Sequence, residues 1–170
     1  MSSCPAGEVK GAVLGKTIVI KAIALAVQNN CLGLPDFIRA MAAQGCDSVL
    51  FDLSDCTGID STFIGVLADA AKCVPRSGEK NVVVLDPEKR FESQLKKVGL
   101  ANLLTIRTEV EKAPEVQFQP IDQMHLPADE RERLTRIMEL HKELVGLNEH
   151  NETQFGEFVK AMELELGDHQ

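Results

Sequence analysis

The sequence predicts an α/β fold, in which a mixed β-sheet of four or five strands is covered by helices and followed by a C-terminal α-helical extension. Apolar runs rich in β-branched residues alternate with segments of helical spacing over the first two thirds of the chain, and Gly or Pro separates them. Two more amphipathic segments follow a polar stretch. With 170 residues, 44% of them hydrophobic, the chain can form one domain with its own core and an appendage.

A β-hairpin is expected at the start of the sheet. Residues 9–14 and 17–26 have strand character, and the turn signal at Gly15 separates them. A short amphipathic helix follows, because Pro35 suits a first helical turn and Gly45 suits a helix end.

The next strand and helix are predicted around a compact apolar run at 48–53, which is typical of a buried strand. A polar loop then leads into a second helix that ends at Pro75. Its inner face is expected to carry Ile64, Leu67, Ala68, Ala71 and Val74.

The last units of the sheet are predicted from a third apolar strand at 81–85. Asp86 can cap a helix with Pro87 at its first position, and Gly99 closes that helix. A final strand is expected at 103–107. The inner stripe of the helix is Phe91, Leu95 and Val98.

The chain divides into an α/β domain at 1–118, a linker at 119–127 and a two-helix extension at 128–170. The extension has 11 acidic and 5 basic side chains, so it carries most of the net negative charge. Two interpretations are open. The helices pack on their own domain as a hairpin, or they form a surface for a homodimer or another partner.

Composition excludes several classes of function. A net charge of -8 and the absence of Trp and Tyr argue against direct binding to nucleic acid. No apolar run reaches the ~20 residues that a membrane-spanning helix needs. The start of the sequence has neither a basic leader nor an apolar core, so we expect a cytoplasmic protein that does not associate with membranes.

Cysteine and histidine spacing gives no sign of a metal site or another cofactor. There is no C-x-x-C or H-E-x-x-H pattern. The favoured interpretation is that the cysteines are small apolar residues. The alternative is redox sensing through Cys56 and Cys73. The five cysteines are Cys4, Cys31, Cys46, Cys56 and Cys73. The four histidines, His125, His141, His150 and His169, all follow the α/β domain and are expected to be isolated surface or helix-face residues.

The functional signal lies where the strand at 48–53 leads through its loop into the second helix. Ser61 is a natural N-cap for the helix, and this capping is its simplest explanation. The same position would accept a phosphate, because the helix N-terminus offers a positive field and free N–H groups. A phosphate of about -1.5 to -2 charge beside Asp60, with Asp55 in the same loop, would make the surface strongly acidic.

The segment Ile59-Asp60-Ser61-Thr62-Phe63-Ile64-Gly65 resembles the Asp-Ser-Ser/Thr-Gly-Leu-Gly signature of STAS domains, named for sulfate transporters and anti-sigma factor antagonists. The order of elements agrees over about residues 8–118. The resemblance implies phosphorylation at Ser61, or less favourably Thr62, by an anti-sigma factor that is also a serine kinase, and reversal by a serine phosphatase. It also implies that the unphosphorylated form binds this anti-sigma factor and frees a sigma factor in a bacterium. The partner-binding residues would be Thr57, Gly58, Ile59, Asp60, Ser61, Thr62 and Phe63.

Two departures from the family pattern affect the expected partner surface. Phe63 replaces the usual glycine and would place a bulky ring beside Ser61. Residues 26–30 lack the Gly-x-Asp-like loop that contributes an acidic contact in those proteins.

Catalysis is not expected. The G-x-S-x-G elbow of serine hydrolases is missing, no histidine lies within the α/β domain to serve as a base, and there is no G-x-x-x-x-G-K-S/T phosphate loop. The alternative to partner switching is a non-phosphorylated STAS scaffold, or a module that senses a nucleotide or another small ligand.

Overall fold

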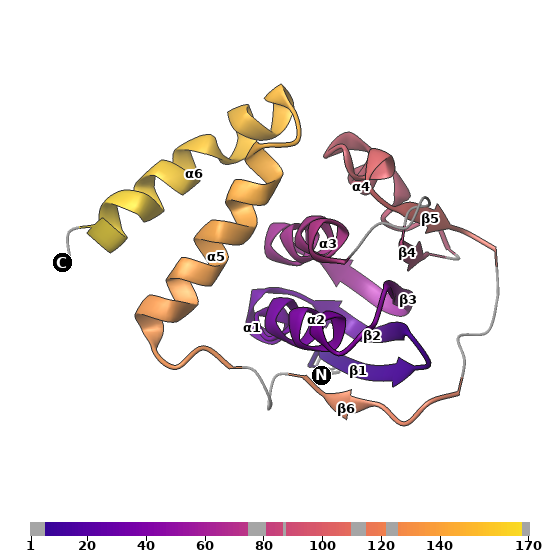
Figure 1. Cartoon of the computed structure of the whole chain (residues 1–170). Helices are drawn as coiled ribbons and strands as arrows, with labels where there is room; N and C mark the ends of the chain where they lie inside the picture. Colours follow the sequence, from indigo (N-terminus) through magenta and orange to yellow (C-terminus); the bar gives the residue numbers. More distant parts are fainter. Residues whose placement is uncertain (1–5, 75–80, 87, 110–114, 122–125, 168–170) are drawn as a thin grey trace, which may run out of the picture.

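The computed structural model describes residues 6–74, 81–86, 88–109, 115–121 and 126–167. It contains a six-stranded sheet with helices packed on it and a C-terminal helical hairpin that lies beyond those helices (Figure 1). The α/β class with a C-terminal helical extension is therefore confirmed, with six strands in place of four or five.

The strand order is β5-β4-β3-β2-β1-β6. β2, β3, β4 and β5 are parallel neighbours, whereas β1 pairs antiparallel with both β2 and β6. The expected hairpin is formed by β1 and β2. The strands are β1 Glu8–Leu14, β2 Thr17–Ala26, β3 Ser48–Ile59, β4 Val82–Leu85, β5 Thr105–Arg107 and β6 Gln119–Pro120.

Most helices lie between the strands in the chain order, and the last two follow β6. They are α1 Gln28–Cys31, α2 Leu34–Ala43, α3 Ser61–Cys73, α4 Glu92–Lys97, the 3-10 turn η1 Leu100–Asn102, α5 Glu130–Val145 and α6 Glu149–Gly167. Pro35 lies in the first turn of α2, as expected, and the backbone leaves that helix through Gly45, where φ is 105°. Pro75, the expected end of α3, lies outside the described residues.

The core lies between the sheet and its helices. The central strands align Ile20 with Phe51 and Phe51 with Val84, and all three side chains are fully buried. Many of the side chains that alternate with this core, including Leu50 and Val83, are only partly buried, so the continuous apolar runs in these strands do not mean full burial on both faces.

Two local predictions were wrong. The expected polar loop after Leu53 is strand, because β3 continues to Ile59 and pairs with the end of β2 through two register shifts. The helix expected directly after Asp86 begins at Glu92. Asp86 still organises this turn, since its carboxylate accepts hydrogen bonds from the backbone N–H groups of Arg90, Phe91 and Glu92. Pro87 lies outside the described residues.

Helix α3 is covered on both sides. Its ten residues from Thr62 to Ala71 are all buried, which is the pattern of a helix enclosed by other elements. One side faces the sheet, and α5 packs on the other, with α6 packed against α5 (Figure 1). The C-terminal helices therefore pack on their own domain, and the homodimer stays a prediction.

The described residues carry few features that suggest other functions. Among them, no helix is long and apolar enough to cross a membrane, and no group of three His, Cys, Asp or Glu residues could hold a metal ion. Cys31, Cys46, Cys56 and Cys73 are free thiols. Burial raises the pKa of Cys56 and of Cys73, so neither is activated as a thiolate. Cys4 lies outside the described residues.

Candidate functional site: the N-terminus of helix α3

The first turn of α3 is held by an aspartate. Asp60 is the N-cap residue, and its Oδ1 accepts a hydrogen bond of 2.9 Å from the backbone N–H of Phe63. Its Oδ2 accepts a second, of 2.8 Å, from the N–H of Gln28 at the start of α1. The prediction that Ser61 caps the helix was therefore wrong. Asp60 satisfies the orphan donors of two helix starts, and Ser61 becomes the first residue of α3 with its hydroxyl free for another partner.

That partner comes from the C-terminal extension. Ser61 Oγ lies 2.9 Å from Nε2 of His141, which is 80 residues later in the chain, on α5. The other ring nitrogen, Nδ1, lies 2.8 Å from the carbonyl oxygen of Ile137. A carbonyl only accepts, so Nδ1 carries the proton, and in the neutral ring Nε2 is the acceptor. The Ser61 hydroxyl therefore donates to His141.

The imidazole is held in an apolar setting. His141 is only 4% exposed, and the rings of Phe155 and Phe158 lie against it with centroid distances of 5.8 and 4.7 Å. Burial lowers the pKa of His141, and the Ile137 carbonyl and the Asp60 charge oppose that shift. The neutral ring is thus the stable form at neutral pH.

This contact corrects one premise of the sequence analysis. No histidine lies within the α/β domain, but His141 reaches its serine from outside and is buried, not a surface residue. A hydroxyl that donates to a neutral imidazole is the first half of a serine-nucleophile arrangement. The second half is a carboxylate on Nδ1, and here a backbone carbonyl of the same helix occupies that place.

The other expected contact residues lie at different depths. Thr57 is exposed, and its hydroxyl donates to the carbonyl oxygen of Ala24, whereas Gly58 and Ile59 are half-buried. Thr62 and Phe63 are 2% and 0% exposed, so the structure removes both from the surface that a partner could touch.

The two departures from the family pattern, and the acidic residue expected beside Ser61, lie differently in the structure from what the sequence indicated. Phe63 points inward and packs edge-on against Phe51, with ring centroids 6.1 Å apart, so its ring does not stand beside Ser61 on the surface. Asp55 lies on β3, where it pairs with Lys21 at 3.1 Å. The segment after β2 begins α1, whose first N–H is bound by Asp60.

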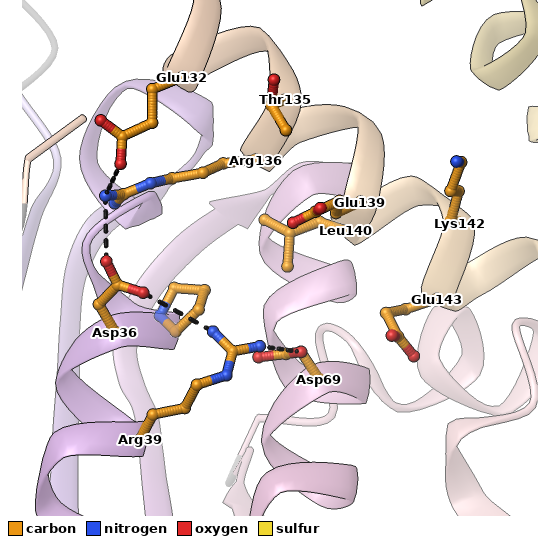
Figure 2. Close-up of a pocket in the computed structure, with 11 residues that line it drawn as sticks. Asp36, Arg39, Asp69, Glu132, Thr135, Arg136, Glu139, Leu140, Lys142 and Glu143 are labelled. Carbon is orange, nitrogen blue, oxygen red and sulfur yellow. Dashed lines mark hydrogen bonds and ion pairs between the residues drawn. The ribbon is translucent and has the colours of Figure 1, made fainter. Parts of the chain in front are cut away.

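Charged residues connect α5 to α2 and α3 beside this site. Figure 2 shows Arg136 of α5 between Glu132 and Asp36, and Arg39 between Asp36 and Asp69. These groups line a pocket of about 530 Å³ with five acidic and three basic side chains. Burial raises the pKa of Asp69, and the Arg39 guanidinium 2.7 Å away opposes that shift.

Sequence reasoning did not place three residues in this arrangement: His141, Arg136 and Gly65, the last of which it quoted only as part of the signature. A Cβ on Gly65 would lie 2.7 Å from the carbonyl oxygen of Leu140, so glycine is what permits α5 to approach α3 this closely. One signal was available. Most of the α3 sequence is apolar, and Asp69 and Lys72 are its only charged residues, which favours cover on more than one side.

The fold and the position of the signature define an α/β domain with a serine at a strand-to-helix junction. The sequence model of the STAS domain matches residues 26–113, and the chain belongs to the STAS domain family. No protein with a curated description matches the sequence.

Two solved structures with similar folds are anti-sigma factor antagonists. The antagonist SpoIIAA in its unphosphorylated form has a TM-score of 0.51 and 14% identity over 59% of this chain and 89% of that chain. An anti-sigma factor antagonist from Mycobacterium paratuberculosis has a TM-score of 0.53 and 14% identity over 65% of this chain and 92% of that chain. At these identities the likeness establishes a shared fold.

Proposed function

We propose that this protein is a bacterial, cytoplasmic anti-sigma factor antagonist that works by partner switching. In the unphosphorylated form it binds an anti-sigma factor that is also a serine kinase, and phosphorylation of Ser61 releases that partner. A serine phosphatase restores the binding form. The protein acts through contacts and not through catalysis of its own.

The observation that carries this proposal is the position of the Ser61 hydroxyl. It belongs to the first residue of α3, which is half-buried, and it is not used to cap the helix because Asp60 does so. Thr62, the alternative acceptor in the signature, is buried, which supports Ser61 as the proposed acceptor. A phosphate there would lie at the positive end of a 13-residue helix, a favourable place for an anion.

The effect on binding follows from charge. A phosphate adds about -1.5 to -2 charge beside Asp60. Repulsion of an acidic or apolar partner surface can cost several kcal/mol, and each 1.4 kcal/mol is about tenfold in affinity. One phosphate would therefore weaken the complex by roughly two to three decades without unfolding the protein.

The test is phosphate mapping and partner capture in the native cell. The chain purified from that cell should carry one phosphate, and peptide mapping should place it on Ser61. Tagged Ser61→Ala should retain a kinase-type anti-sigma factor, whereas Ser61→Asp should lose at least tenfold of it, as judged by quantitative mass spectrometry. Absence of phosphate together with equal capture by both variants would refute the proposal.

A further inference from the structure

We propose that the outer face of α3 is a docking surface for an amphipathic helix, which α5 fills within the chain and which a helix of the partner fills when α5 leaves. The inference deepens the proposed function and rests on it in one respect, namely that the helix arriving from outside belongs to the switching partner. The surface itself is defined by the contacts of α5.

The face of α3 that meets α5 combines a glycine with two polar side chains, since Ser61 contacts His141 and Lys72 pairs with Glu143. Gly65 lies at its centre, directly under the backbone of Leu140. From α5, Ile137, Leu140 and Leu144 are buried against it and join the core. Their spacing of three and four residues places them on one stripe of the helix. A helix fits this face because Gly65 has no side chain, so the backbone of the docked helix can come close to α3.

Polar groups at fixed positions set the register of the docked helix. His141 meets the Ser61 hydroxyl. One residue before Ile137, Arg136 donates to the carbonyl oxygen of Leu32 at 3.0 Å and pairs with Asp36 at 3.0 Å. At the other end, Glu143 pairs with Lys72 of α3.

These contacts describe the helix that the surface accepts. Counted from the first aliphatic residue, it has aliphatic side chains at 0, +3 and +7, a hydrogen-bond acceptor at +4, a basic residue at -1 and an acidic residue at +6. An acceptor is required at +4 because the free Ser61 hydroxyl donates its proton there. A phosphate on Ser61 removes that donor and adds charge at the same point, so a helix of this type can dock only on the unphosphorylated chain.

The fold itself is complete without α5 and α6. The STAS match ends at residue 113, before α5 begins. The antagonists of similar fold are 89% and 92% covered by only 59% and 65% of this chain. The hairpin is therefore an addition to a finished domain. The Lys72–Glu143 pair that joins it to α3 is half-exposed, and pairs of this kind hold an element weakly, whereas the Arg136 side chain of the Arg136–Asp36 pair is only 15% exposed.

The test opens the hairpin in the full chain and then offers the helix again. Leu140→Asp places a carboxylate against Gly65 and should detach α5 while leaving α3 unchanged. The probe is a fluorescein-labelled peptide of residues 129–146, measured by fluorescence anisotropy. We expect it to bind Leu140→Asp at least tenfold more tightly than wild type, in which the tethered α5 competes at an effective concentration on the order of millimolar.

Two matched controls define the surface. The double variant Leu140→Asp with Gly65→Ala should lose the peptide, because the added Cβ would lie 2.7 Å from the carbonyl oxygen of residue 140 of the docked helix. A peptide carrying Leu140→Asp itself should not bind. Hydrogen exchange should show residues 130–167 deprotected in Leu140→Asp and residues 17–26 and 48–59 as protected as in wild type.

Three results would overturn the inference. The first is loss of protection in the sheet together with the hairpin, both in Leu140→Asp and in the milder Arg136→Glu, which would make α5 an integral part of the domain. The second is an intact sheet with no peptide binding. The third is a concentration-dependent wild-type dimer that exchanges hairpins, which would assign the face to a second copy. Peptide binding without any phosphate on Ser61 in the cell would instead refute the proposed function alone.

Discussion

A single methyl group added at Gly65 should loosen the packing of the C-terminal hairpin on α3. The ideal Cβ would lie 2.7 Å from the carbonyl oxygen of Leu140, 2.9 Å from its Cβ and 3.0 Å from its carbonyl carbon. Two of these three atoms belong to the backbone, so a rotamer change cannot relieve the clash. Ordinary contact begins near 3.4 Å, and α5 must therefore move by about 0.7 Å or more.

Two opposing effects decide the magnitude for Gly65→Ala. Alanine is a better helix former than glycine by about 1 kcal/mol, which favours the variant. Overpacking of a buried contact costs typically about 1–3 kcal/mol, and it falls at the upper end where backbone atoms collide. We expect a net loss of about 1–2 kcal/mol of unfolding free energy, concentrated in the hairpin.

The assay is urea unfolding followed by far-ultraviolet circular dichroism, because the chain has no Trp or Tyr for fluorescence. The control is Gly156→Ala on α6, where the nearest atom to the new Cβ is the flexible Glu152 side chain at 3.7 Å. That variant should gain up to about 1 kcal/mol. If Gly65→Ala is as stable as Gly156→Ala, with unchanged hydrogen exchange in α5, the close packing described between α3 and α5 is refuted.

Three other residues give testable predictions. His141 is buried as the neutral ring with a lowered pKa; because the unfolded chain binds a proton near pH 6.5 and the folded chain only at lower pH, stability should fall as the pH drops below about 6.5. The urea midpoint should fall between pH 7.5 and 5.5 in wild type, and it should fall less in His141→Gln. An equal fall in both proteins would exclude His141 as the source of the pH dependence. Asn151 is fully buried and donates to the carbonyl oxygens of Val98 and Leu144, so Asn151→Ala should lose about 1–3 kcal/mol in thermal or urea unfolding, and a neutral effect would contradict its anchoring of the hairpin turn. Asp60→Ala should lose about 0.5–2 kcal/mol through its cap, and Asp60→Asn clearly less; equal losses would show that capping is not the role of this side chain.

Local sequence patterns predicted most of the sheet and its helices. The β1–β2 hairpin follows from the turn at Gly15, and β4 and α2 follow from apolar runs bounded by Pro and Gly. The late start of α4 was missed because Asp86 binds three N–H groups of a turn that comes before the helix. A side chain that can cap a helix can equally close a loop, and spacing alone does not separate the two.

The candidate site was only half visible in the sequence. Asp60 and Ser61 follow from the signature, but which of them caps α3 depends on the approach of α1 and α5. The contact between Ser61 and His141 joins residues 80 positions apart, and no periodicity reports a pair of that kind. The high apolar content of α3 could be read from the sequence, whereas the identity of the element that covers it required the tertiary structure.

The short strand β6 has a consequence for solubility. It lies along β1 through Lys10 opposite Pro120 and Gly11 opposite Gln119, so it forms the outer border of the sheet on that side (Figure 1). An uncovered border strand invites pairing with a neighbouring molecule, and very short strands that contain proline are a known protection against it. Pro120 has no N–H to offer, so this margin should resist stacking into larger aggregates.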